Sequence, residues 1–160
     1  MPKPLMQDYD WAGWSKWISL AKMYNDGFSM LSEGAGAYVI GTTALQIPRV
    51  FGRDKHGLLY AGESSDLRSR IRAFYDCVQR GHQTHTAGWQ YNLVGFERCA
   101  PVESLRVRWW NARTRREALD VQIELLHAYA VNHCELPPLN CSISRELTRE
   151  LGFRLVRKGA

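Results

Sequence analysis

Residues 57–70, GLLYAGESSDLRSR, decide the fold because they join a strand to a helix across a glycine turn. Residues 58–61 form a short apolar and aromatic run, which is typical of a strand. Ser65 or Asp66 then caps a helix that ends near Gly81. The buried face of this helix is predicted from apolar residues at helical spacing, namely Leu67, Ile71, Phe74 and Val78.

Two further strands and a long helix are predicted around this unit. Residues 34–41, GAGAYVIG, form a short strand between glycines, and the connection that follows suits an antiparallel pair with an extended loop. Residues 105–110 predict a third strand, which is one-sided because arginines alternate along it. The stretch 114–117, TRRE, is a capping box that begins a long helix ending near Asn132.

The two ends of the chain add smaller elements. Residues 9–30 predict an amphipathic helix, since Trp11, Trp14 and Ile18 recur at helical spacing. A short last helix begins at Ser144. The fold class is therefore α+β, with a small three-stranded mixed or antiparallel sheet flanked by helices and an extra N-terminal helix. A single domain is expected, made of an N-terminal helical extension (1–33), a core (34–142) and a C-terminal helix with a basic tail (143–160).

The charge of the chain favours an acidic partner. The 160 residues carry a net charge of +5, and the basic residues are 16 Arg against 5 Lys. Arginine presents a planar fork that suits bidentate contact with phosphate. A basic domain of this kind is drawn to polyanions, nucleic acid first, although a solvated arginine surface is the alternative.

Composition excludes several other classes. Hydrophobic residues at 45% and charged residues at 23% are typical of a globular protein and not of a disordered one. No apolar run approaches the ~18 residues of a membrane helix, and the start has no secretory pattern, so we expect a cytoplasmic protein without a membrane partner. The four cysteines form no CxxC pair and are expected to be free, buried thiols; a zinc site at His133, Cys134 and Cys141 is the weaker alternative. Oligomeric state is left open.

Four polar residues form a candidate constellation. Tyr38 and Tyr60 fall on the first two predicted strands and can lie side by side if those strands pair. Arg70 borders the apolar stripe of the following helix and can lean toward the sheet. Glu124 is expected on the apolar face of the long helix, where a carboxylate needs Arg70, His127 or a divalent metal as its partner. A purely structural salt bridge is the alternative.

Taken in order, five pieces of the chain resemble the GIY-YIG nuclease family: Gly36-Ala37-Tyr38, Tyr60-Ala61-Gly62, Arg70, Glu124 and Pro138-Leu139-Asn140. Arg70 follows Tyr60 by ten residues, and Glu124 precedes Asn140 by sixteen. The resemblance implies the sheet and helices above and a DNA endonuclease. Such an enzyme would hydrolyse phosphodiester bonds with one divalent metal, Mg²⁺ or Mn²⁺.

The resemblance also implies roles for single residues. Glu124 would be the protein ligand of the metal, and Arg70 would contact a nonbridging phosphate oxygen. Tyr38 would orient or deprotonate the attacking water, and Tyr60 would hydrogen-bond the water or the phosphate. Further substrate-binding candidates are Arg68, Arg72, His82, His85 and Asn140. For Asn140 a structural role is the preferred expectation.

The chain departs from the family pattern in three places. Both tripeptides carry alanine where isoleucine is usual, and Glu63 adds a negative charge beside the presumed phosphate site. Phe74 stands where many members have histidine, so His82 or His85 would have to take that role. Two other functions compete with the nuclease: a non-catalytic nucleic-acid-binding domain on the same fold, and a structural domain in which Arg70 and Glu124 tie two helices together.

Overall fold

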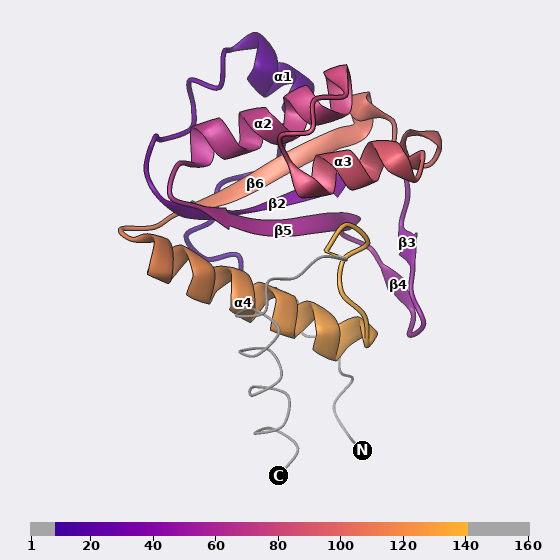
Figure 1. The fold of residues 1–160 in the computed structure, drawn as a ribbon. Helices are drawn as coiled ribbons and strands as arrows, with labels where there is room; N and C mark the ends of the chain where they lie inside the picture. The colour runs from indigo at the N-terminus through magenta and orange to yellow at the C-terminus, as the bar shows by residue number, and fades with distance from the viewer. Residues whose placement is uncertain (1–8, 141–160) are drawn as a thin grey trace.

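The computed structural model describes residues 9–140 of the chain (Figure 1). Its centre is an antiparallel four-stranded sheet with the order β1-β6-β2-β5. The three predicted strands are all present, and a fourth, very short strand extends the sheet. The strands are β1 (Ile18–Ser19), β2 (Gly36–Thr42), β5 (Leu58–Ser64) and β6 (Leu105–Asn111).

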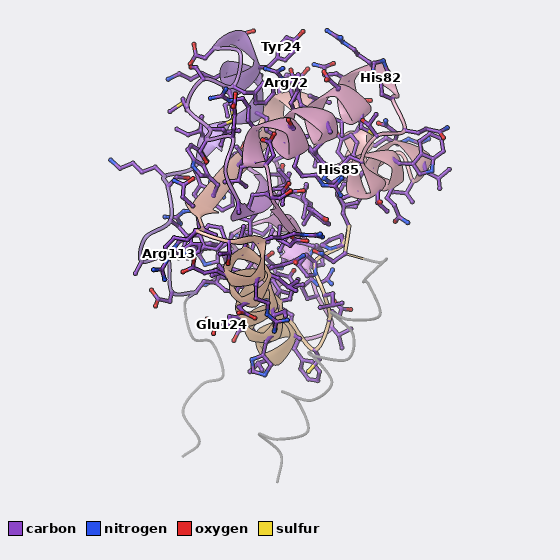
Figure 2. All side chains as sticks on the ribbon, turned by 60° about the vertical axis from the view of Figure 1, so that its left-hand side comes forward. Tyr24, Arg72, His82, His85, Arg113 and Glu124 are labelled. Carbon is purple, nitrogen blue, oxygen red and sulfur yellow. The ribbon has the colours of Figure 1, made fainter. Side chains whose placement is uncertain are left out.

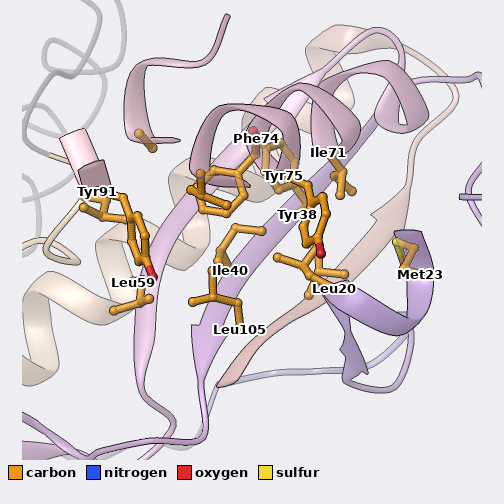
Figure 3. Close-up of a cluster of buried hydrophobic side chains, with 14 of the residues drawn as sticks. Leu20, Met23, Tyr38, Ile40, Leu59, Ile71, Phe74, Tyr75, Tyr91 and Leu105 are labelled. Atoms are coloured by element: carbon orange, nitrogen blue, oxygen red, sulfur yellow. The ribbon is translucent and has the colours of Figure 1, made fainter. Parts of the chain in front are cut away.

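Helices cover both faces of this sheet. One face carries α1 (Leu20–Asn25), α2 (Leu67–Arg80) and α3 (Thr86–Leu93), and the other carries α4 (Arg115–His133). Because side chains alternate along a strand, β2 sends Tyr38 and Ile40 into the core under α2 and Val39 into the core under α4. Figure 3 shows the first of these cores, in which Tyr38 lies among Ile71 and other buried apolar side chains.

The predicted helix ends are confirmed by their caps. The Asp66 carboxylate accepts a hydrogen bond from Ser69 N at 3.0 Å, and α2 ends at Gly81 in the left-handed conformation. At the start of α4, the Thr114 hydroxyl accepts from Glu117 N at 3.1 Å, while the Glu117 carboxylate accepts from Arg113 N at 2.8 Å. These exchanges satisfy backbone donors that the first turn of a helix leaves free.

The prediction of a helix over residues 9–30 is wrong, because only α1 within that range is helical. Ser15 pairs instead with β6, donating its N–H to Trp109 O at 2.8 Å. The nearby tryptophan rings pack on the arginines of β6, with Arg108 4.4 Å from the Trp11 ring centroid. The tryptophans recur at helical spacing, but they pack against the strand β6 and do not lie on one face of a helix. Tertiary contacts therefore override the local periodicity here.

Several elements were not predicted. They are a small hairpin of β3 (Ile47–Pro48) and β4 (Arg53–Asp54), the helix α3, and two 3₁₀ turns, η1 (Phe96–Arg98) and η2 (Val102–Ser104). The predicted helix from Ser144 lies outside the described residues.

Three cysteines lie within the described residues, and they differ in exposure. Cys77 is free and buried as expected, whereas Cys99 and Cys134 are free but exposed. Cys141 lies outside the described residues. Within residues 9–140, no helix combines the length and the apolar character that crossing a bilayer demands.

Candidate active site

Four polar side chains from four different elements converge beneath α2. Tyr38 comes from β2, Tyr60 from β5, Arg70 from α2, and His85 from the position just before α3. The ring centroids of Tyr38 and Tyr60 are 5.9 Å apart, and those of Tyr60 and His85 are 5.5 Å apart. We call these four residues the Tyr-Arg-His cluster.

His85 is held in one orientation from both ring nitrogens. It caps α3, where its Nδ1 accepts from Gly88 N at 3.4 Å, and its Nε2 lies 2.7 Å from the Tyr38 hydroxyl. A backbone N–H can only donate, so the proton of the neutral ring resides on Nε2 and is donated to Tyr38. Burial, with a smaller contribution from the Arg70 charge, lowers the pKa of His85 from 6.5 to about 3. His85 is therefore neutral at physiological pH.

The Arg70 guanidinium lies against both tyrosine hydroxyls. Burial raises the pKa of Tyr38 well above its ordinary value, and it raises the pKa of Tyr60 as well. Arg70 opposes this in both cases through its charge and through hydrogen bonding. Both phenols are consequently protonated at neutral pH, and they act as hydrogen-bonding groups beside a fixed positive charge.

Solvent access distinguishes the two tyrosines. Tyr38 is fully buried, with 0% of its surface exposed, whereas Tyr60 and Arg70 are half-buried. Tyr60 and Arg70 thus each keep part of their surface open to solvent, and Tyr38 keeps none. This burial does not favour the expectation that Tyr38 contacts the attacking water.

The crowding around position 62 explains why a glycine follows Tyr60 and Ala61. It pairs with Tyr38 across β2 and β5, and a methyl group at Gly62 would lie 2.7 Å from Tyr38 Cζ and 2.7 Å from Tyr60 Cε1. The two rings occupy the space where a side chain would stand. The glycine is therefore required for the close approach of both tyrosines.

Glu124 does not join the cluster, and its predicted place on the buried face of the long helix is wrong. The residue is exposed, and α4 packs on the sheet face opposite to α2. Figure 2 shows Glu124 on α4, apart from His85. An Arg70–Glu124 tie between two helices is excluded by the same placement.

Gln122 occupies the buried position that was predicted for Glu124. It is 6% exposed, and its Nε2 donates to Ala61 O at 3.0 Å, between Tyr60 and Gly62. Residues two apart on a helix differ by about 200° in direction, so only one of Gln122 and Glu124 can face β5. The spacing of Gln122 from Ala118 and Tyr129, both buried, is the sequence signal that could have identified this face.

The predicted metal ligand, Glu124, does not lie at the cluster, and the cluster itself does not fit such a metal. Tyr38, Tyr60, Arg70 and His85 include no carboxylate, whereas Mg²⁺ and Mn²⁺ prefer oxygen ligands that carry negative charge. Within residues 9–140, no group of three or more His, Cys, Asp or Glu side chains is placed to hold a metal ion. We therefore assign no step to a metal at these residues.

Asn140 supports the backbone at the Tyr60-Ala61-Gly62 motif. Its Oδ1 accepts from Ala61 N at 2.9 Å, and its Nδ2 donates to Ala61 O at 2.9 Å. The amide thus replaces a neighbouring strand at the outer edge of β5, where Leu139 N also donates to Leu59 O. Asn140 is 4% exposed, so this geometry favours the structural role over substrate binding.

The arginines beside Arg70 point elsewhere. Arg68 forms an ion pair with Glu33 at 2.7 Å and donates to Leu31 O, and Arg72 donates to Gly27 O at 3.1 Å. Both arginines attach α2 to the segment before β2 and lie outside the cluster. Their predicted contact with substrate is not favoured by these contacts.

Of the two histidines that could replace the family histidine, the structure brings only His85 into the cluster. The His85 ring packs edge-on against Phe74, with centroids 5.3 Å apart, so Phe74 supports the histidine from the neighbouring helix. His82 is exposed just beyond the end of α2 (Figure 2). Histidine is not a favoured N-cap residue, so the local sequence held no signal that separates His85 from His82.

Glu63 is directed away from the cluster. Gly62 lies on the α2 side of β5, so Glu63 points to the α4 side, where the Arg115 guanidinium donates to both carboxylate oxygens at 3.1 and 3.0 Å. Its negative charge is therefore paired with Arg115, although, beside the main effect of burial, it still contributes slightly to the raised pKa of Tyr60.

Comparisons with models of protein families, with curated proteins and with solved structures found no match for this chain.

Proposed function

We propose that this chain is a nuclease domain that hydrolyses DNA phosphodiester bonds at the surface of the Tyr-Arg-His cluster. The observation that carries the proposal is the convergence of Tyr60, Arg70, Tyr38 and His85 from four elements onto one partly exposed spot. The resemblance of the two tyrosine motifs and Arg70 to the GIY-YIG nucleases supports it, as does the net charge of +5.

The half-buried pair would contact the phosphate directly. Arg70 keeps its charge at any ordinary pH and offers its fork to a nonbridging oxygen, where it would neutralise charge that builds up during hydrolysis. The Tyr60 hydroxyl, held protonated, would donate to a phosphate oxygen or orient a water. Tyr38 and His85 would act as positioning residues, because the chain from Gly88 N–H through His85 to Tyr38 fixes the hydroxyl beside Tyr60.

A nucleic-acid-binding domain without cleavage is the second candidate. One specific observation favours it: the exposed Glu124 stands apart from the cluster, while Gln122, which bears no charge, faces the motif. A binding domain needs Arg70 and Tyr60 for the phosphate but needs no carboxylate.

The test is a cleavage and binding assay on supercoiled plasmid and labelled single strands, with Mg²⁺, with Mn²⁺ and with chelator. Arg70→Gln is compared with Arg72→Gln, an arginine of the same helix that contacts Gly27. Tyr60→Phe is compared with Tyr24→Phe, whose hydroxyl contacts Arg80. We expect Arg70→Gln and Tyr60→Phe each to lower the rate about 10²-fold, as does loss of one preorganised donor in other enzymes.

The two candidate functions give different results. Cleavage that falls with Arg70→Gln and Tyr60→Phe, and stays with both controls, supports the nuclease. Wild-type protein that binds DNA but cuts no substrate under any metal condition favours the binding domain. Cleavage that is indifferent to Arg70 and Tyr60 would refute the site.

A further inference from the structure

The β3–β4 hairpin ends in two exposed apolar residues. Arg49 N donates to Gly52 O at 3.1 Å, and Gly52 has a φ of 73°, so Val50 and Phe51 form the tip of a tight turn. Val50 is 71% exposed and Phe51 is 60% exposed. Figure 1 shows the hairpin projecting at the right of the molecule, beside the start of β5. The tip thus presents two adjacent apolar side chains to solvent.

Buried hydrogen bonds and an ion pair hold the base of the hairpin against the rest of the molecule. The buried Asp54 carboxylate accepts from Leu58 N at 2.8 Å and from the Tyr129 hydroxyl at 3.1 Å. Arg49 forms an ion pair with Glu135 at 2.6 Å, and its guanidinium lies 5.8 Å from the Tyr129 ring centroid. Leu58 is the first residue of β5, the strand that also carries Tyr60. The hydrogen bond from Leu58 to Asp54 therefore connects the hairpin to the strand that contributes to the Tyr-Arg-His cluster.

The negative charge of the hairpin is buried, whereas two of its positive charges face solvent. Asp54, its only carboxylate, is 1% exposed and points inward, while Arg53 and Lys55 on either side are exposed. Among the described residues, neither Arg53 nor Lys55 forms an ion pair. An apolar tip with cations at its base is complementary to a polyanion that also offers an apolar interior.

We propose that the β3–β4 hairpin is a wedge for duplex DNA, in which Phe51 inserts at a base step while Arg53 and Lys55 contact the flanking phosphates. The proposal takes its partner, DNA, from the function proposed above. The shape favours a duplex over a single strand, since single strands are bound in grooves with aromatic platforms and Phe51 stands on a convex tip. Apolar side chains that enter a duplex separate adjacent bases and bend the helix.

The test uses the full chain with Tyr60→Phe, in chelator, and duplexes that carry 2-aminopurine, a base whose fluorescence rises when it loses stacking. Phe51→Ser is compared with Leu93→Ser, a residue with 67% exposure on α3. We expect Phe51→Ser to abolish the fluorescence rise and to weaken duplex binding about tenfold. Leu93→Ser should change neither. Both sites are exposed, and thermal unfolding verifies that the variants fold.

The phosphate contacts have their own readout. Removing the charges with Arg53→Gln and Lys55→Gln together should reduce the slope of log K against log salt by about 1.8, since each lost contact contributes about 0.9. Phe51→Ser should leave that slope unchanged because it removes no charge. An unchanged slope in the double variant would overturn the assignment of these two cations.

Failure of the wedge and failure of the nuclease are distinguishable. Protein that cuts DNA while Phe51→Ser matches Leu93→Ser refutes the wedge alone. Protein that unstacks 2-aminopurine through Phe51, and whose unmodified form never cuts, refutes the nuclease alone. Absence of all DNA binding refutes both. Dimerisation that is lost with Phe51→Ser, without any fluorescence change, would make the tip a contact between copies of the chain and would overturn the proposal.

Discussion

The Tyr38 hydroxyl and Nε2 of His85 lie 2.7 Å apart, in a contact that joins the central strand β2 to the start of α3. Both side chains are buried, with 0% and 2% of their surfaces exposed. A buried hydroxyl needs a partner, and here a helix-capping histidine supplies it. The contact couples the stability of α3 to the orientation of Tyr38, and through Tyr38 to Tyr60.

This coupling predicts a result for a double-mutant cycle. His85→Phe should destabilise the protein by about 1–3 kcal/mol, because it leaves the Tyr38 hydroxyl buried without that partner. Tyr38→Phe in the same background should recover part of the loss. Urea unfolding of the wild type, the single variants and the double variant measures the coupling, expected at about 0.5–3 kcal/mol. Strictly additive effects would contradict the direct contact.

The neutral state of His85 predicts a dependence of stability on pH. The pKa of His85 is about 3 in the folded chain, compared with 6.5 for an ordinary histidine. Between these two pH values the unfolded chain binds a proton that the folded chain does not bind. Stability should therefore fall as the pH drops from 6.5 toward 3, by up to about 1.4 kcal/mol per pH unit. Urea unfolding of wild type and His85→Gln between about pH 7 and about pH 4.5 isolates the effect. Parallel curves for the two proteins would contradict it.

The close packing at Gly62 predicts a sharp cost for one methyl group. Gly62→Ala forces Tyr38 and Tyr60 apart and should destabilise the chain by about 1–3 kcal/mol, because the rings are rigid and Tyr38 is fully buried. Gly34→Ala is the matched control, since its nearest neighbour, Ser32 Oγ, would be 3.7 Å away. It should change the unfolding free energy by less than about 0.5 kcal/mol. Equal effects of the two substitutions in urea unfolding would contradict the packing argument.

Gln122 and Glu124 lie on opposite sides of the same turn of α4, so substitutions at the two positions should have very different effects on stability. Gln122→Glu replaces the donor to Ala61 O with a buried carboxylate and should cost at least about 2 kcal/mol. Glu124→Gln, at an exposed position, should change the unfolding free energy by less than about 0.5 kcal/mol. The same Glu124 variant should keep the DNA cleavage rate of the wild type. Loss of cleavage with Glu124→Gln, in a protein of unchanged stability, would restore the role that the sequence suggested.

Local signals were sufficient for most of the framework. The caps at Asp66 and Thr114 predicted where α2 and α4 begin, Gly81 predicted the end of α2, and the apolar stripe from Leu67 to Val78 predicted the buried face of α2, because caps and periodicity act within a few residues. The antiparallel pairing of residues 36–42 with 58–64 also followed from the length of the connection between them. The place of Arg70 beside the apolar stripe of α2 predicted that it can lean toward the sheet, and the resemblance to the GIY-YIG family selected it among the arginines of that helix.

By itself, then, the sequence determined the main strands and helices and the nearness of Tyr38, Tyr60 and Arg70. Only the tertiary structure decided which other groups reach them. It selected His85 over His82, because the loop after α2 folds back under Phe74, and it turned Gln122 rather than Glu124 toward β5. The place of His85 depends on the path of this loop, and the choice between Gln122 and Glu124, which point about 200° apart, depends on how α4 is rotated on its sheet. Both are set by long-range packing and not by local propensity.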